Sequence, residues 1–155
     1  MVIAAVALRA VVRIARSNLR RYEIAERSME PTLRAGDWVI AIPWRRAKRG
    51  DVVVIPHPER PGFELVKRVI GLPGETVTVT AAGDVVILEG GADEWGRAAT
   101  LPAGVWKVPA DTVFVLGDAR HQSNADSRVL GSLPRESIEW QIRFRYWPPD
   151  RIGFL

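Results

Sequence analysis

Short runs rich in Val, Ile and aromatic residues follow one another along most of the chain, separated by Gly, Pro and Asp. From residue 37 onward they read DWVIAIPW, DVVVIP, FELVKRVIGL, ETVTVT, DVVILEG, GVWKVP, DTVFVLGD and IEWQIRFRYW. Runs of this length, bounded by turn residues, predict β-strands. Their regular spacing predicts a mainly β, antiparallel domain. Residues 76–112, rich in Gly, Ala and Thr, are predicted to be a small inserted β region that carries a hairpin.

The first 21 residues follow a different pattern. Arg9, Arg13, Arg16 and Arg20 interrupt and follow an apolar stretch at spacings of four, three and four. This spacing places the arginines on one face of an amphipathic helix, which we predict for residues 1–21 ahead of a domain at 22–155. The uncharged runs are far shorter than the roughly 20 apolar residues of a spanning helix. No basic region precedes them, as it would in a secretory signal.

Two roles for this helix remain open. It can lie in a membrane interface, which we favour because Arg lines its polar face. It can also dock on the core of the chain or on a partner. We therefore expect a membrane-associated protein, peripheral or interfacial, and a cytoplasmic one if the helix does not bind lipid.

The amino-acid composition limits which kinds of disulfide, metal and cofactor site are possible. The chain has 155 residues, 47% of them hydrophobic, which suffices for one core with a small subdomain. It has no Cys, which excludes disulfides and thiolate metal sites, and its two His residues, His57 and His121, make a His-rich metal site a poor interpretation. We expect no metal and no cofactor.

Lysine is rare although Lys and Arg together number 22: the lysines are Lys48, Lys67 and Lys107. A buried Lys can lose its proton, whereas Arg stays charged. Lys67 lies inside an apolar strand, where alternation places it on one face and Val66 and Arg68 on the other. If that face is buried, desolvation lowers the lysine pKa and makes the amine a competent base. The strand alone favours a solvent-exposed Lys67, because buried lysines are uncommon.

Ser28 stands in RSMEPTL, before a Pro-Thr turn, where it can cap the turn or attack a substrate. A nucleophilic Ser needs a base, and Lys67, His57 and His121 are the candidates. Both histidines lie in predicted loops, and no G-x-S-x-G elbow accompanies a Ser-His-Asp arrangement. Ser-Lys is a recognised variant of the same chemistry.

Four motifs in order carry a family resemblance: SMEPTL with GDWV, then RGDVVVI, then KRVIGLPGE, then GD…S…DSR…G. From about Ile24 to the C-terminal RYWPPDRIG, this order resembles the type I signal peptidase family of membrane-associated Ser-Lys endopeptidases. The resemblance implies a mainly β catalytic domain with a smaller inserted β region. It implies a protein substrate, bound as an extended strand beside residues 22–27 and 64–66, from which an N-terminal signal or pro-segment is cleaved.

The resemblance also implies a role for each matching residue. Ser28 would be the nucleophile, with its own N–H as one oxyanion donor, and Lys67 the general base. The supporting residues would be Met29 beside the nucleophile, Pro31 and Thr32 in the turn, an Asp126–Arg128 ion pair, and Gly117, Asp118 and Gly131 in the loop behind the lysine.

The chain departs from the family pattern at three places. Glu26 stands where some members have a Ser that helps the oxyanion hole, and an ionised Glu cannot donate a hydrogen bond. Ala119 replaces a usual Asn in a loop that is one residue longer than expected, so either Ser123, which we favour, or Asn124 would contact the lysine. The usual spanning anchor is not predicted, which points toward short members that resemble nickel superoxide dismutase maturation proteases.

Alternatives from other classes have weaker support. A basic β-barrel with six Trp could bind single-stranded nucleic acid, but its aromatic residues are scattered and its net charge is modest. A self-cleaving Ser-Lys regulator would need a DNA-binding domain, for which the residues before Ser28 leave no room. We predict a serine endopeptidase that does not bind nucleic acid.

Overall fold

The computed structural model describes residues 18–88, 90–96 and 98–155. Its larger sheet has eight strands, in the order β1-β2-β11-β3-β4-β9-β10 with β12 paired to β11. Every pairing in it is antiparallel, which confirms the predicted mainly β class. Its strands are β1 (Arg20–Glu23), β2 (Trp38–Pro43), β3 (Val52–Pro56), β4 (Glu64–Gly71), β9 (Thr112–Leu116), β10 (Leu133–Pro134), β11 (Trp140–Trp147) and β12 (Gly153–Phe154).

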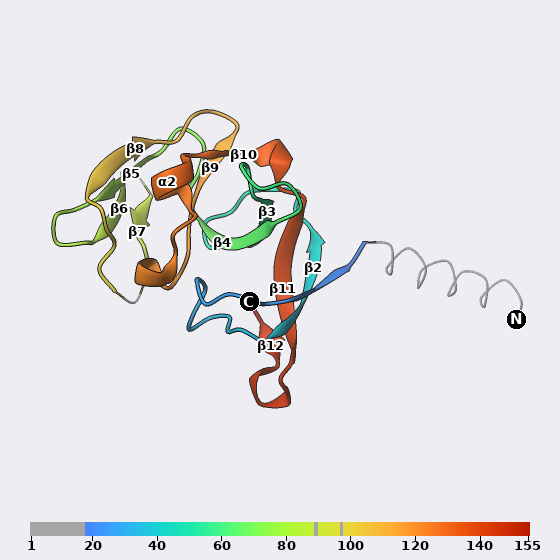
Figure 1. Cartoon of the computed structure of the whole chain (residues 1–155). Helices are drawn as coiled ribbons and strands as arrows, with labels where there is room; N and C mark the ends of the chain where they lie inside the picture. Colours follow the sequence, from blue (N-terminus) through green and yellow to red (C-terminus); the bar gives the residue numbers. More distant parts are fainter. Residues whose placement is uncertain (1–17, 89, 97) are drawn as a thin grey trace, which may run out of the picture.

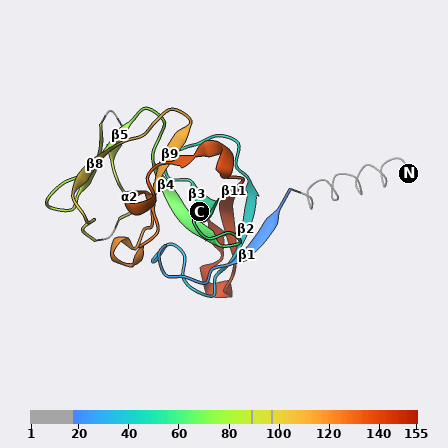
Figure 2. The same cartoon turned by 45° about the horizontal axis from the view of Figure 1, so that its top comes forward.

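A second, four-stranded sheet has the order β7-β6-β5-β8. Its strands are β5 (Thr76–Val79), β6 (Val85–Leu88), β7 (Gly91–Ala92) and β8 (Gly104–Lys107). This small sheet lies at one end of the molecule, and β2 and β11 lie at the other (Figures 1 and 2). It falls within the range 76–112 that we predicted, although Thr112 already belongs to β9 of the larger sheet. That this region is an insertion remains a prediction.

Helical segments in the described residues are short. They are α2 (Ser127–Leu130) and the single 3-10 turns η1 (Arg120–Gln122), η2 (Arg135–Ser137) and η3 (Pro149–Arg151). Within the described ranges, none of these segments has the length and apolar character that crossing a bilayer requires.

The predicted N-terminal helix lies mostly outside the described residues. Its end was predicted wrongly, because Arg20 and Arg21 belong to β1, where they pair with Ala41 and Ile40 of β2. The backbone groups of these residues are thus engaged in the sheet and cannot continue a helix to residue 21. The arginine spacing that suggested one helix face extends by chance into a strand.

Strand β4 lies at the meeting point of three hydrophobic clusters. Val66 packs against the first cluster, Leu65 and Val69 belong to the second, and Ile70 belongs to the third. The third cluster also contains Val77 from the small sheet, so apolar packing joins the two sheets. Both faces of β4 are therefore covered beyond its exposed first residue, Glu64, so a buried polar side chain on this strand must find a partner.

Candidate active site

Ser28 lies in a turn that is fixed from both sides. Its carbonyl accepts a hydrogen bond from Ala119 N at 3.0 Å, and Leu33 N donates to Met29 O at 2.9 Å. Met29 and Leu33 are buried in the first hydrophobic cluster, so Met29 packs beside the serine as the resemblance implied. Apolar side chains thus anchor a turn whose serine is only 6% exposed.

Lys67 is buried on the face of β4 that it shares with Leu65 and Val69, and its side chain is 2% exposed. Its Nζ lies 2.8 Å from Ser28 Oγ. Lys48 and Lys107 are both exposed. Of the two interpretations that the strand left open, the structure supports the buried one.

Burial disfavours the ammonium form of Lys67. Desolvation is the largest influence and lowers the pKa of this lysine below its ordinary value of 10.5. The negative charges of Asp126, Glu26 and Asp118 act in the opposite direction but do not restore the pKa. Burial thus shifts this lysine toward the neutral amine, which is the form a general base requires.

Gly117 allows the loop behind the dyad to approach closely. A Cβ at this position would lie 2.5 Å from both Ser123 Oγ and Ser28 O, so a larger residue would push the loop and the nucleophile apart. This contact explains why the predicted loop residue is glycine.

Ser123 differs from its predicted role. It is buried near the dyad, but its hydroxyl donates to Asp126 Oδ2 at 2.6 Å, and the described residues show no hydrogen bond between Ser123 and Lys67. The carboxylate is the stronger acceptor and accepts the hydrogen bond from this hydroxyl. The other candidate, Asn124, is exposed and lines the cavity in front of the dyad.

Asp126 and Arg128 form the predicted ion pair, with Arg128 Nη2 at 2.8 Å from Asp126 Oδ2. Burial alone would raise the pKa of Asp126, but hydrogen bonds from Arg128 and Ser123 outweigh it and hold that pKa below its ordinary value. Asp126 also caps the short helix α2, because its side chain accepts from Arg128 N. Asp126 therefore stays ionised near the lysine, where its negative charge raises the Lys67 pKa and the positive charge of Arg128 lowers it.

A second buried pair was only partly foreseen. Asp118 was predicted to shape the loop, and it does so by accepting from Arg68 Nε at 2.8 Å, from Arg68 Nη2 at 2.6 Å and from Thr32 Oγ1 at 2.6 Å. Arg68 follows Lys67 directly and points to the opposite face of β4. The carboxylate therefore joins the nucleophile turn to the strand that carries the base. The sequence signal for this contact was a second buried charge inside an apolar strand.

The small sheet region also supports this loop, which the sequence did not suggest. Asp93 forms an ion pair with the fully buried Arg120, and the Trp95 ring lies 5.2 Å from the Arg68 guanidinium in a cation–π contact. Arg128 Nη1 donates to Leu101 O. Asp93, Trp95 and Leu101 thus contact three arginines in and beside the loop that surrounds the lysine.

The dyad opens onto two cavities. One, of about 620 Å³, is lined by Ser28, Lys67 and Asn124 among others. The other, of about 350 Å³, lies between residues 22–26 and 62–66 and also reaches Ser28. Glu26 lines both. Together they form an open cleft large enough for a peptide.

The histidines are not placed to act on Ser28. His57 lines the larger cavity and its Nδ1 accepts from Glu59 N at 3.1 Å. His121 is exposed and contacts Gln122. The described hydrogen bonds join Ser28 Oγ to Lys67 and not to either imidazole, so they give no support to a Ser-His-Asp arrangement.

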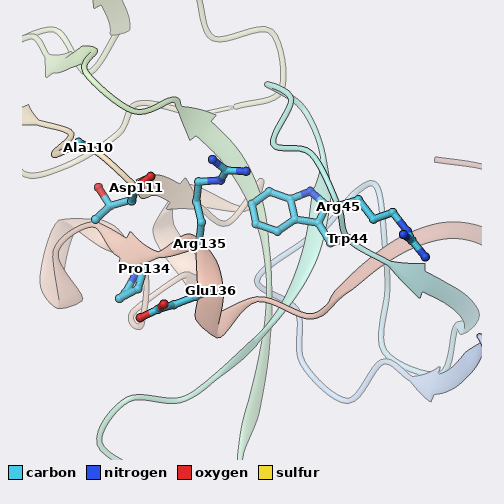
Figure 3. Close-up of a pocket in the computed structure, with 8 residues that line it drawn as sticks. Trp44, Arg45, Ala110, Asp111, Pro134, Arg135 and Glu136 are labelled. Carbon is cyan, nitrogen blue, oxygen red and sulfur yellow. The ribbon is translucent and has the colours of Figure 1, made fainter.

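A further cavity, of about 570 Å³, contains none of the predicted site residues. Figure 3 shows the Arg135 side chain extending toward the Trp44 ring, with Asp111 on the opposite side and Glu136 on the turn below. This cavity has mixed charge and lacks a nucleophile next to a base.

Comparison with known proteins agrees with this geometry. Residues 1–147 match the sequence model of the family described as signal peptidase, peptidase S26. The chain is 39% identical over 147 residues to the signal peptidase I of Leptolyngbya laminosa, covering 85% of this chain and 70% of that protein. It is 33% identical over 132 residues to mitochondrial inner membrane protease subunit 1 of Mus musculus, covering 83% of this chain and 69% of that one.

A solved structure shows the same fold. The crystal structure of a signal peptidase I from Enterococcus faecalis superposes with a TM-score of 0.51 at 26% identity, covering 61% of this chain and 94% of the other. These matches give no support to the nucleic-acid alternative. The chain belongs to the signal peptidase family, peptidase S26, and is a serine endopeptidase that acts on a protein substrate.

Proposed function

We propose that Ser28 is the nucleophile of this peptidase and that Lys67, as a neutral amine, is its general base. The observation that carries the proposal is the 2.8 Å separation of Lys67 Nζ and Ser28 Oγ, together with the burial of both side chains. An alcohol is a weak nucleophile until a base takes its proton. A lysine with a lowered pKa is such a base, and its position at hydrogen-bonding distance satisfies the geometric requirement.

The reaction then proceeds in two halves. Ser28 Oγ attacks the scissile carbonyl while Lys67 Nζ takes the hydroxyl proton, and the resulting ammonium gives that proton to the leaving amine. An acyl-enzyme ester on Ser28 remains. Lys67 next takes a proton from a water molecule, whose oxygen attacks the ester. The ammonium then gives this proton to Ser28 Oγ as the acid product leaves, which restores both side chains.

The oxyanion of each tetrahedral intermediate needs donors that point at it. We assign one to the N–H of Ser28, which donates to no acceptor among the hydrogen bonds of the described residues. Glu26 cannot be a second donor while ionised. It is therefore a place where this chain differs from relatives with a hydroxyl there.

We propose that the substrate binds as an extended strand between residues 22–27 and 64–66. β1 is an edge strand of the larger sheet. β9 pairs with β4 only at Arg68, Val69 and Gly71, so the β9 side of residues 64–66 has no strand partner in the described part of the chain. Free backbone groups at a strand edge are the usual basis of β-strand addition by a peptide.

Membrane association is proposed on separate grounds. The side chains of Trp38, Trp147 and Phe154 are 38%, 51% and 83% exposed. They lie on β2, β11 and β12, and β11 pairs with both of the other strands. Tryptophan is favoured at the membrane–water interface. With the predicted basic helix ahead of β1, these residues would hold the domain at a lipid surface. The narrower role of a nickel superoxide dismutase maturation protease remains a prediction.

The dyad is tested by four single variants and a panel of peptides with small residues before the scissile bond. Ser28→Ala, Lys67→Met and Lys67→Arg should each abolish cleavage, because Arg keeps the charge of Lys but cannot act as the base. Lys48→Arg is the matched control and should cleave at the wild-type rate, since Lys48 is exposed. Cleavage by Lys67→Arg near the wild-type rate would overturn the mechanism.

A further inference from the structure

The smaller cavity beside Ser28 has an apolar floor. Its lining includes Ile24, Met29, Val54 and Val66, which all pack in or against the first hydrophobic cluster. This floor extends between the two segments that we propose to flank the substrate. An aliphatic chain a few carbons long would therefore be buried against it.

The charged residues that line this smaller cavity are all acidic, whereas the larger cavity, which Glu26 and Glu64 also line, contains Arg27, Arg60 and Lys67. The lining of the smaller cavity includes the carboxylates of Glu23, Glu26 and Glu64 and no Lys or Arg. Glu64 shares a face of β4 with Val66, and Glu26 lies close enough to the dyad to raise the pKa of Lys67. Glu23 lies on the opposite face of β1 from the half-buried Tyr22, so Glu26 and Glu64 carry the argument.

The neighbouring cations do not neutralise these two carboxylates by direct pairing. Arg27 forms its ion pair with Glu30, at 3.0 Å, and the ion pairs of the described residues include neither Glu26 nor Glu64. Arg20 interacts electrostatically with Glu64, but its guanidinium lies over the Trp140 ring, 4.5 Å from the centroid. Glu64 therefore has a cation near it, and Glu26 is the carboxylate with less competition for a substrate cation.

We propose that this cavity selects a basic side chain, Arg or Lys, at one substrate residue close to the scissile bond. The methylene stem would lie on the apolar floor, and the cationic end would reach Glu26 and Glu64. Long basic side chains bury their stems in this way while keeping the charge at a polar rim. The inference rests on the proposed cleft and specifies the class of substrate that it accepts.

The test is a set of peptides in which Arg, norleucine or Glu replaces one residue at a time near the scissile bond. At one position we expect kcat/KM for Arg to exceed that for norleucine about five-fold, the scale of a partly exposed ion pair, and Glu to be the poorest. This ratio should fall toward one in Glu26→Gln, and further in Glu26→Gln combined with Glu64→Gln. Glu136→Gln, an exposed carboxylate at the separate cavity of Figure 3, should keep the wild-type ratio.

Binding of the same peptides to Ser28→Ala, followed by Trp fluorescence, provides a readout that needs no turnover. It should show the same order of affinities, with the preference for Arg reduced at high salt. Equal kcat/KM for Arg and norleucine at every position, or a ratio unchanged in the double variant, would overturn the inference while leaving the dyad intact. Failure of the dyad would instead appear as cleavage that survives Ser28→Ala.

Discussion

The carboxylate of Asp118 offers a direct test of how the site is held together. It accepts two hydrogen bonds from Arg68 and one from Thr32, at 2.6–2.8 Å, and it is fully buried. Asp118→Asn keeps the shape of the side chain but removes its charge. The Arg68 guanidinium would then be a buried cation without a counter-charge.

The expected loss of stability follows from this geometry. Removing one partner of a buried ion pair costs about 3–5 kcal/mol. Asn keeps one oxygen as an acceptor, so we expect the lower end of this range, about 3 kcal/mol. For a chain of this size each kcal/mol corresponds to roughly 2–4 °C in Tm, so the variant should melt about 10 °C below the wild type.

Circular dichroism melts of Asp118→Asn and of the exposed control Asp150→Asn measure this difference. The pH dependence of kcat/KM gives a second readout, because the negative charge of Asp118 raises the pKa of Lys67. Without that charge the lysine loses its proton more readily, and the rise of activity with pH should occur at lower pH than in the wild type.

Equal melting temperatures for Asp118→Asn and Asp150→Asn would refute the account of a buried pair that joins the turn to β4. A melting loss with the pH profile unmoved would leave the pair as a structural brace and remove its electrostatic action on the lysine.

Three further predictions concern the same network. The folded pKa of Lys67 lies below its unfolded value of 10.5. The unfolded chain therefore binds more protons between the two values, and the stability of the wild type rises with pH across that window. Lys67→Met, compared with the wild type by urea unfolding at several pH values, should have its largest stability advantage below the window and should lose it as the pH approaches 10.5. Activity of Glu26→Gln on a neutral peptide should rise at lower pH than in the wild type, because Glu26 raises the pKa of Lys67; an unmoved profile would show that the two groups do not interact. Asp93→Asn removes the partner of the buried Arg120 and should cost about 3 kcal/mol in chemical unfolding, whereas an unchanged midpoint would mean that the small sheet does not brace the loop.

Much of the fold could be predicted because its strands are short and regularly punctuated. Alternating Val and Ile with Gly, Pro and Asp at the ends define β2 to β6, β8, β9 and β11 at nearly their observed positions. β1 could not be predicted in this way, since its sequence, RRYE, is polar and continues a helical arginine spacing. It becomes a strand only because β2 supplies a partner edge.

The sequence predicted which residues make up the candidate site better than it predicted their hydrogen-bond partners. Ser28 and Lys67 are 39 residues apart, and the ordered motifs, not any local pattern, brought them together in the prediction. The hydroxyl of Ser123 turns to Asp126, and Arg68 pairs with Asp118 across 50 residues. The hydrogen-bond partner of a buried donor depends on how distant segments pack together. The periodic pattern of the sequence carries no information about that packing.

The contacts between the small-sheet region and the loop around the lysine could not be predicted, for the same reason. Asp93, Trp95 and Leu101 lie in turns of a region that the sequence marked only as a hairpin-bearing insertion. Their contacts with Arg120, Arg68 and Arg128 exist because the third hydrophobic cluster brings the small sheet against β4 and β9.

The protonation state of Lys67 is the claim on which the account depends most, and the chain is well suited to measuring it. With only Lys48, Lys67 and Lys107 present, a protein labelled with ¹³C at lysine Cε gives three signals, and Lys67→Met identifies the one from Lys67. Titration by NMR should show that this signal changes at a pH clearly below the ordinary lysine value of 10.5. A Lys67 signal that changes only near that ordinary value would show a charged Lys67 at neutral pH and contradict the dyad.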